Sequence, residues 1–126
     1  MIIETIDALA IFHEIGYTHN DLKYANIMLS SNLDVTLIDF DCAKPYLKRI
    51  DSDESTKEHI STGTVEVFAG NIIWSSLNHM QFNVTSRKDD LMSAAYMTLM
   101  LLNRNQFPLL DKRYAVPFKT QEEMQA

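Results

Sequence analysis

Two carboxylates, a lysine and a side-chain amide occur close together in the chain, in a pattern suited to phosphoryl transfer. One stretch holds Asp21, Lys23 and Asn26, in the order His19-Asn20-Asp21-Leu22-Lys23-Tyr24-Ala25-Asn26, and a second holds Asp39-Phe40-Asp41. Phosphoryl transfer needs a carboxylate that accepts a hydroxyl proton, oxygen ligands for Mg²⁺ and a cation that faces the phosphate. Asp and Asn are also common turn formers, so neither acid alone identifies a site. The combination of the carboxylates, the lysine and the amide favours a site for phosphoryl transfer.

Two short β-prone runs separate these stretches and are expected to bring them together. Residues 27–29 and 35–38 are rich in apolar residues, and residues 30–34 between them have turn chemistry. They predict a small antiparallel hairpin, whose second strand runs back along the first. Asp39 should therefore return to the neighbourhood of the loop that carries Asp21 and Asn26.

A helix is predicted on each side of this hairpin. Apolar residues recur at helical spacing over residues 2–15, and Gly16 stands where a helix C-cap would. Ser86 and Asp89 form a capping-box pattern before a strongly apolar helix over about residues 87–103. Because that helix is apolar on all sides, we expect it to be buried on all sides. Residues 42–69 lack periodicity and are expected to form a long connection, and the tail after residue 104 has weak helical character.

The composition describes one globular domain, or part of one. The chain has 126 residues, 46% of them hydrophobic, and a formal net charge of −6. Proteins that bind nucleic acid or anionic membranes use clustered Lys and Arg, so we expect neither partner. The longest uncharged run, residues 91–103, is shorter than the roughly 20 residues of a spanning helix. A single cysteine, Cys42, and the absence of a leader predict a cytoplasmic or nuclear protein.

Four motifs in series resemble the catalytic domain of a eukaryotic protein kinase, in particular the casein kinase 1 family. Residues 19–26 are similar to the catalytic loop H-R-D-L-x-x-x-N, and residues 39–41 occupy the place of D-F-G. Residues 70–78 resemble the substrate-binding end of the family's activation segment, here residues 42–78. Residues 86–91 resemble S-R-R-D-D-L at the start of its central helix. The resemblance runs in order through most of residues 1–110.

This resemblance implies a fold, an activity and a set of site residues. The fold is α+β: a mainly α-helical, protein kinase-like C-terminal lobe fragment with a small antiparallel β-hairpin. The activity is transfer of the γ-phosphate of ATP, with Mg²⁺, to a Ser or Thr hydroxyl of a protein substrate. Asp21 would be the catalytic base and Lys23 the phosphate contact. Asn26 and Asp39 would bind the cofactor and its metal.

The same resemblance assigns two structural roles and marks two departures. Asp90 would brace the catalytic-loop backbone from the central helix, and His19 would be a core histidine. Asn20 replaces the arginine that receives an activation-segment phosphate, so activation by that route is not expected. Asp41 replaces the glycine of D-F-G and adds negative charge near the proposed metal ligands.

Residues 1–126 are therefore interpreted as a partial protein kinase domain. The chain has three glycines, none of which forms a glycine-rich phosphate loop with another. In kinases that loop belongs to the N-terminal lobe, which we expect to be absent from this chain. The truncated chain is accordingly expected to be inactive. The sequence leaves the protein substrate, its regulators and the oligomeric state open.

Two other interpretations remain open. Small-molecule phosphotransferases of the aminoglycoside and choline kinase type share H-x-D-x-x-x-x-N and an I-D-F-[DE] segment, which residues 38–41 match. They usually carry His where this chain has Lys23, and they lack the motifs at 70–78 and 86–91. The other interpretation is a kinase-like pseudoenzyme that acts as an interaction module. Asn20, Asp41 and the absent glycine-rich loop favour it.

Overall fold

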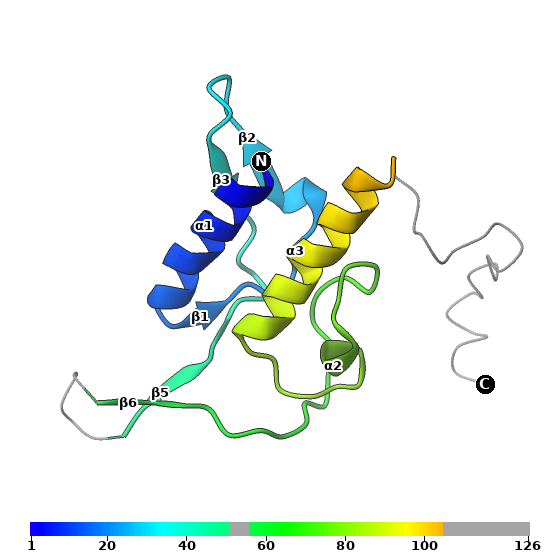
Figure 1. Ribbon diagram of the computed structural model, residues 1–126. Helices are drawn as coiled ribbons and strands as arrows, with labels where there is room; N and C mark the ends of the chain where they lie inside the picture. Colours follow the sequence, from blue (N-terminus) through cyan, green and yellow to red (C-terminus); the bar gives the residue numbers. More distant parts are fainter. Residues whose placement is uncertain (51–55, 105–126) are drawn as a thin grey trace, which may run out of the picture.

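A computed structural model describes residues 1–50 and 56–104, in which helices combine with three two-stranded antiparallel sheets (Figure 1). Residues 51–55 of the expected 42–69 connection and the tail over residues 105–126 lie outside the described residues. In chain order the elements are α1 (Ile2–Glu14), β1 (Tyr17–Thr18), the 3₁₀ helix η1 (Tyr24–Asn26), β2 (Ile27–Leu29), β3 (Val35–Leu37), β4 (Lys44–Pro45), β5 (Leu47–Arg49), β6 (Lys57–His59), α2 (Leu77–Met80) and α3 (Arg87–Leu102).

The first helix begins and ends where its sequence predicts. α1 ends at Glu14, and Gly16 then adopts a positive φ of 102° while its N–H bonds to the His13 carbonyl at 2.9 Å. Glycine reaches this left-handed conformation without steric cost, which is why it ends helices well. The chain therefore turns sharply after α1 and enters β1, which leads into residues 19–26.

The predicted hairpin is confirmed as β2 and β3. These strands pair antiparallel, with Ile27 opposite Leu37 and Leu29 opposite Val35. In the turn, the Ser30 hydroxyl accepts the backbone N–H of Asp34 at 3.0 Å, and Leu33 takes a positive φ of 68°. A side-chain oxygen that bonds backbone two to four residues later is a common way to fix such turns. The hairpin thus returns the chain to the start of β2.

The expectation of one hairpin and an irregular segment over residues 42–69 is wrong. β4 pairs with β1 far back in the chain, and β5 pairs with β6. Thr18 reinforces the first pairing, since its hydroxyl donates to the Lys44 carbonyl at 3.2 Å. These strands are two or three residues long and mostly exposed, so their sequence has no apolar alternation to reveal them. Backbone pairing between distant segments decides their structure.

The apolar central helix is buried on one side only, which corrects the expectation of burial all round. α3 spans Arg87–Leu102, close to the predicted range, and the Ser86 N–H donates to the Asp89 carboxylate at its start at 2.7 Å. Ala94 and Met97 face the interior, whereas Leu91, Leu99 and Leu102 are 45%, 46% and 76% exposed. These three side chains line an open groove together with Ile2 and Ile6 of α1. Within residues 1–50 and 56–104, no helix combines the length and apolar content needed to cross a bilayer.

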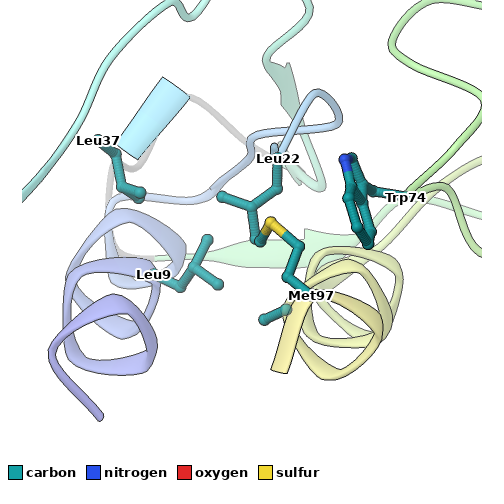
Figure 2. Close-up of a cluster of buried hydrophobic side chains, with 6 residues drawn as sticks. Leu9, Leu22, Leu37, Trp74 and Met97 are labelled. Atoms are coloured by element: carbon teal, nitrogen blue, oxygen red, sulfur yellow. The ribbon is translucent and has the colours of Figure 1, made fainter. Parts of the chain in front are cut away.

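The hydrophobic core lies between α1 and α3 and takes in one residue of the 19–26 loop. Figure 2 shows Leu9 on α1 and Met97 on α3 approaching from opposite sides, with Leu22 between them. Leu37 and Trp74 close the cluster. Leu22 is 1% exposed, so the loop that carries the candidate catalytic residues is anchored in the core by one of its own side chains.

Candidate functional site

The Asp21 side chain is buried and is held by three side-chain nitrogens. Its Oδ1 accepts from the Asn71 amide at 3.0 Å, and its Oδ2 accepts from the Asn26 amide at 3.2 Å. Lys23 Nζ lies 3.4 Å from the same Oδ2. A carboxylate with donors on both oxygens is held in one orientation and is compensated for its burial. The structure therefore brings Asp21, Lys23 and Asn26 together.

The Asn26 amide has a fixed orientation. Its Nδ2 donates to the Asp21 backbone carbonyl at 2.8 Å as well as to the Asp21 carboxylate. Because Nδ2 faces Asp21, Oδ1 is directed away from it. Asn26 is buried at the end of η1, where its own backbone carbonyl accepts from Ile38 N–H at 3.0 Å.

The hairpin returns Asp39 to this loop, as its strand pairing predicts. Ile38, the preceding residue, bonds to Asn26 through its N–H and to the His19 ring through its carbonyl, at 3.1 Å from Nε2. Asp39 itself is exposed and has a positive φ of 63°. Its described support is one long contact of 3.5 Å, from the Asp41 N–H to Oδ1. Asp39 is thus adjacent to the loop but weakly held.

A buried acid beneath the loop fixes its backbone. Asp90 Oδ2 accepts the His19 N–H at 2.8 Å, and Oδ1 accepts the Asn20 N–H at 2.9 Å. The His13 ring on α1 also lies 2.8 Å from Asp90 Oδ2. The bracing expected of Asp90 is confirmed, and the His13 contact, which the sequence analysis did not foresee, ties α1 into the same network.

His19 is a structural residue in this arrangement. It is fully buried, its Nδ1 accepts the Asp21 N–H at 3.3 Å, and its Nε2 faces the Ile38 carbonyl. A carbonyl can only accept, so this pattern assigns the proton to Nε2. Both ring nitrogens are used within the protein, which leaves His19 no nitrogen for moving protons to or from a substrate.

Asn71 is the site residue that the sequence analysis missed. Its Nδ2 donates to Asp21 Oδ1 and to the Leu22 carbonyl at 3.2 Å, while its Oδ1 accepts the Trp74 N–H at 2.9 Å. The amide therefore joins the 70–78 segment to the proposed base. Its place directly after Gly70 within a recognised motif was the available signal, but the motif does not reveal a contact made with a residue fifty positions earlier.

Three carboxylates act on the thiol of Cys42, which follows Asp39 and Asp41 in the chain. Burial raises the pKa of the Cys42 thiol, and the charges of Asp21, Asp39 and Asp41 raise it further, while Lys23 lowers it. The three carboxylates are thus near enough to act on one thiol from two different loops. Such a concentration of acid favours binding of a cation.

Asn26 and Asp39 carry oxygen atoms of the kind that Mg²⁺ binds in proteins. Mg²⁺ usually takes one or two protein carboxylates or amide oxygens and keeps water or phosphate oxygens at its other positions. Asn26 Oδ1 is directed away from Asp21, and Asp39 is exposed, so both side chains are compatible with that donor set. Among the described residues, no group of three or more His, Cys, Asp or Glu side chains forms a metal cluster.

Comparison with known proteins finds protein kinases. Residues 1–124 match the protein kinase domain family. A probable casein kinase I homolog of Encephalitozoon cuniculi is 31% identical over 114 residues, which are 90% of this chain and 34% of that protein. The human ribosomal protein S6 kinase alpha-4 is 33% identical over 60% of this chain and 9% of its own length. The serine/threonine-protein kinase ppk8 of Schizosaccharomyces pombe is 44% identical over 34% of this chain and 8% of its own length.

The chain thus spans about a third of the casein kinase I homolog and less of the other relatives. The family match covers almost all of it, including the loop around Asp21, the hairpin and α3. The resemblance read from the four motifs is confirmed, and this chain belongs to the protein kinase domain family.

Proposed function

We propose that this chain carries the base and part of the metal site of a serine/threonine protein kinase of casein kinase 1 type. Such an enzyme transfers the ATP γ-phosphate to a Ser or Thr hydroxyl of a protein. The observation that carries the proposal is the buried Asp21 carboxylate, which Asn26, Asn71 and Lys23 hold in the loop before the hairpin. The casein kinase I relative and the motifs at 70–78 and 86–91 support the family type.

In this proposal Asp21 orients the substrate hydroxyl and accepts its proton. Its two oxygens have separate donors, so the carboxylate does not need to reorganise when the hydroxyl arrives. Lys23, at 3.4 Å from Asp21 Oδ2 and partly exposed, is placed to turn from the carboxylate toward the transferred phosphate. Its charge would offset the negative charge that builds up on the phosphoryl oxygens.

Asn26 and Asp39 are proposed as the residues that hold Mg²⁺ with ATP. When bound, the ion would bridge phosphate oxygens and neutralise their charge. Asn26 is rigid and buried, whereas Asp39 is exposed and has weak support, so Asp39 is the ligand free to adjust. Asp41 adds a further negative charge beside it.

We also propose that these residues belong to the large, C-terminal lobe of the kinase domain, and that the 126-residue chain has no turnover of its own. The order of catalytic loop, hairpin, activation segment and central helix supports the lobe assignment. The three glycines are too far apart in the chain to form a glycine-rich loop over the phosphates. Steady phosphorylation of casein by the purified chain with Mg·ATP would contradict this part.

The metal site can be tested in the chain as it is. Mn²⁺ takes the same oxygen ligands as Mg²⁺ and broadens the NMR signals of nuclei close to it. With ¹⁵N-labelled chain and Mn²⁺, alone or with ATP, we expect selective broadening of the Asn26 side-chain amide and of the Asp39 and Phe40 backbone amides. Excess EDTA should reverse it.

Three variants assign the ligands. Asp39→Ala should abolish the broadening, since it removes the one carboxylate ligand. Asp34→Ala, which removes an exposed carboxylate in the β2–β3 turn, is the matched control and should retain it. Asp21→Asn should also retain it, because the base is not a ligand. Uniform or absent broadening would reject the metal site and favour the pseudoenzyme interpretation.

A further inference from the structure

Asn20 makes contacts in three directions although its side chain is short. Its backbone N–H is bound by Asp90, and its Nδ2 donates to the Cys42 carbonyl at 3.1 Å. Asn20 is 7% exposed, and its Oδ1 has no hydrogen-bond partner in the described part of the chain. The donor side of the amide is therefore what orients it. Asn20 also has a positive φ of 64°, a conformation that asparagine tolerates better than most residues.

The third contact is between backbones. A Cβ added at Gly70 would lie 2.3 Å from the Asn20 carbonyl oxygen and 3.2 Å from His79 Cε1. Gly70 also has a positive φ of 131°, so only glycine fits there without a shift of backbone. The residue after it, Asn71, donates to Asp21. The close approach of Gly70 to Asn20 thus sets where Asn71 meets the proposed base.

We propose that Asn20 is a positioning residue that fastens both ends of the Cys42–Gly70 stretch to the catalytic loop. One end is held by the hydrogen bond from the Asn20 amide to the Cys42 carbonyl. At the other end, Gly70 lies so close to the Asn20 carbonyl oxygen that a Cβ there would clash, and Asn71 beside it bonds to the loop. The nearby Ala43 N–H to Phe40 carbonyl bond closes the turn but does not join it to the loop. β4 is held separately by β1 two residues later. Asn20 therefore controls the turn that follows Asp39.

This fastening carries no charge. An amide bound to a carbonyl, and a glycine packed on a carbonyl, need no anion to complete them. The importance of this for turnover depends on the proposed kinase function, but the positions themselves do not.

Cys42, the chain's one cysteine, provides the measurement. Its thiol is half-buried and its carbonyl is the atom that Asn20 binds, so its rate of alkylation by iodoacetamide reports opening of the turn. The chain should first be shown by intact mass to carry no phosphate. Cys42 in the folded chain should then react at least tenfold more slowly than Cys42 in the chain unfolded by urea. The two rates are compared at pH values that give the same fraction of thiolate, which the pH dependence of alkylation in each state provides. Equal rates would overturn the proposal.

Two pairs of variants isolate the two contacts. Asn20→Gly keeps the positive φ but removes the amide, and should speed alkylation about three- to tenfold, the effect of losing one hydrogen bond. Asn32→Gly, at an exposed turn position, should not. Gly70→Ala should also speed alkylation, although Gly70 is far from Cys42 in the sequence. Gly63→Ala is its control, because the added Cβ would meet nothing nearer than Val84 at 3.8 Å.

The double variant separates positioning from general loss of stability. If one residue holds both ends, Asn20→Gly with Gly70→Ala should speed alkylation by clearly less than the product of the two single effects. Independent destabilisation would give the full product and would overturn the proposal. Should Gly70→Ala lose its far-UV circular dichroism, the Asn20→Gly arm decides alone: a folded variant with a rate within twofold of the parent also overturns it. None of these readouts needs turnover, so a negative result leaves the proposed phosphoryl transfer standing.

Discussion

Residues 19–26 and residues 39–42 supply the two halves of the candidate site, and the protein holds them very differently. The first segment is mostly buried, is anchored in the core by Leu22 and is bound by Asp90 of the central helix. The second is mostly exposed, and within residues 1–50 and 56–104 the Asp39 carboxylate has one long contact, of 3.5 Å with the Asp41 N–H. The proposed base is therefore preorganised within this chain, whereas Asp39, the proposed carboxylate ligand of the metal, is not.

This difference follows from what each half is proposed to do. A base must be positioned before the substrate hydroxyl arrives, because reorganisation during reaction is costly. A metal ligand can be ordered by the metal itself, since the binding free energy of a cation with its phosphates is available for that purpose. We therefore expect substitutions in the first segment to change stability, and substitutions in the second to change binding.

The largest effect is expected from Asp90→Ala. It leaves the backbone N–H groups of His19 and Asn20 without their buried acceptor, and His13 without its partner. We expect a loss of about 3–5 kcal/mol in the free energy of unfolding, measured by urea denaturation. Asp7→Ala, on the exposed side of α1, should change it by no more than about 0.5 kcal/mol. Similar losses in both would remove the proposed role of Asp90 as the support of the loop.

A smaller loss is expected from Asn71→Ala. The substitution removes the Asn71 amide, which donates to Asp21 Oδ1 and to the Leu22 carbonyl and accepts from the Trp74 N–H. These three groups would then have to hydrogen-bond to water in its place. Because the site is partly exposed, we expect a loss of about 1–3 kcal/mol in the same urea measurement. Asn32→Ala, in the exposed hairpin turn, is the matched control. If Asn71→Ala had no more effect than the control, the base would not depend on the 70–78 segment for its support.

A pH-dependent effect is expected from His79, which lies beneath the Gly70 turn. Burial lowers the pKa of its imidazole below the usual range, and its ring stacks on Phe68 with centroids 4.4 Å apart. Below pH of about 6.5, the unfolded chain takes up a proton that the folded chain does not. The stability that neutral His79 contributes is therefore present above that pH and is lost as the pH falls toward the lowered value.

Unfolding in urea at pH 7.5, 6.5 and 5.5 measures this effect. His79→Gln should flatten the decline in stability toward low pH, whatever its effect at pH 7.5. His59→Gln changes an exposed histidine and should leave the decline in place. Were the decline unchanged in His79→Gln, the pH sensitivity would belong to other groups, and the support beneath Gly70 would not be its source.

The smallest effect on folding is expected from Asp39→Asn. The side chain is exposed, and asparagine tolerates the positive φ of this position. Urea denaturation should show a change within about 0.5 kcal/mol. The same variant should weaken the binding of Mn²⁺, because a neutral amide replaces a charged ligand. A large loss of stability without any change in metal binding would reverse the proposed contrast between the two segments.

The sequence predicts those parts of the fold that rest on local patterns. Helical spacing and Gly16 predict α1, the turn at 30–34 predicts the β2–β3 hairpin, and the capping box predicts the start of α3. The hairpin in turn predicts that Asp39 returns to the 19–26 loop. Each of these depends on residues close together in the chain, where propensity and hydrogen-bonding chemistry act directly.

The parts that were missed rest on contacts between distant segments. β4 is a strand because Thr18 lies beside it, and Asn71 joins the site because Gly70 packs on Asn20. Neither pairing leaves a periodic trace in the sequence. The expected burial of α3 on all sides was wrong for a related reason. An apolar pattern indicates which side chains favour an interior, but it does not indicate whether other segments of the described chain pack against Leu99 and Leu102.

Leu22 links the hydrophobic core of this protein to the proposed base, Asp21. It sits in the core between Leu9 and Met97, and it is joined to Asp21 by one peptide bond, across which consecutive Cα atoms are about 3.8 Å apart. A tightly packed interior passes on small changes of shape instead of absorbing them. Inherited changes at Leu9 or Met97 that leave the protein abundant would therefore still shift the proposed base. In the proposed kinase, natural selection would then act on this core through the rate of phosphoryl transfer as well as through folding.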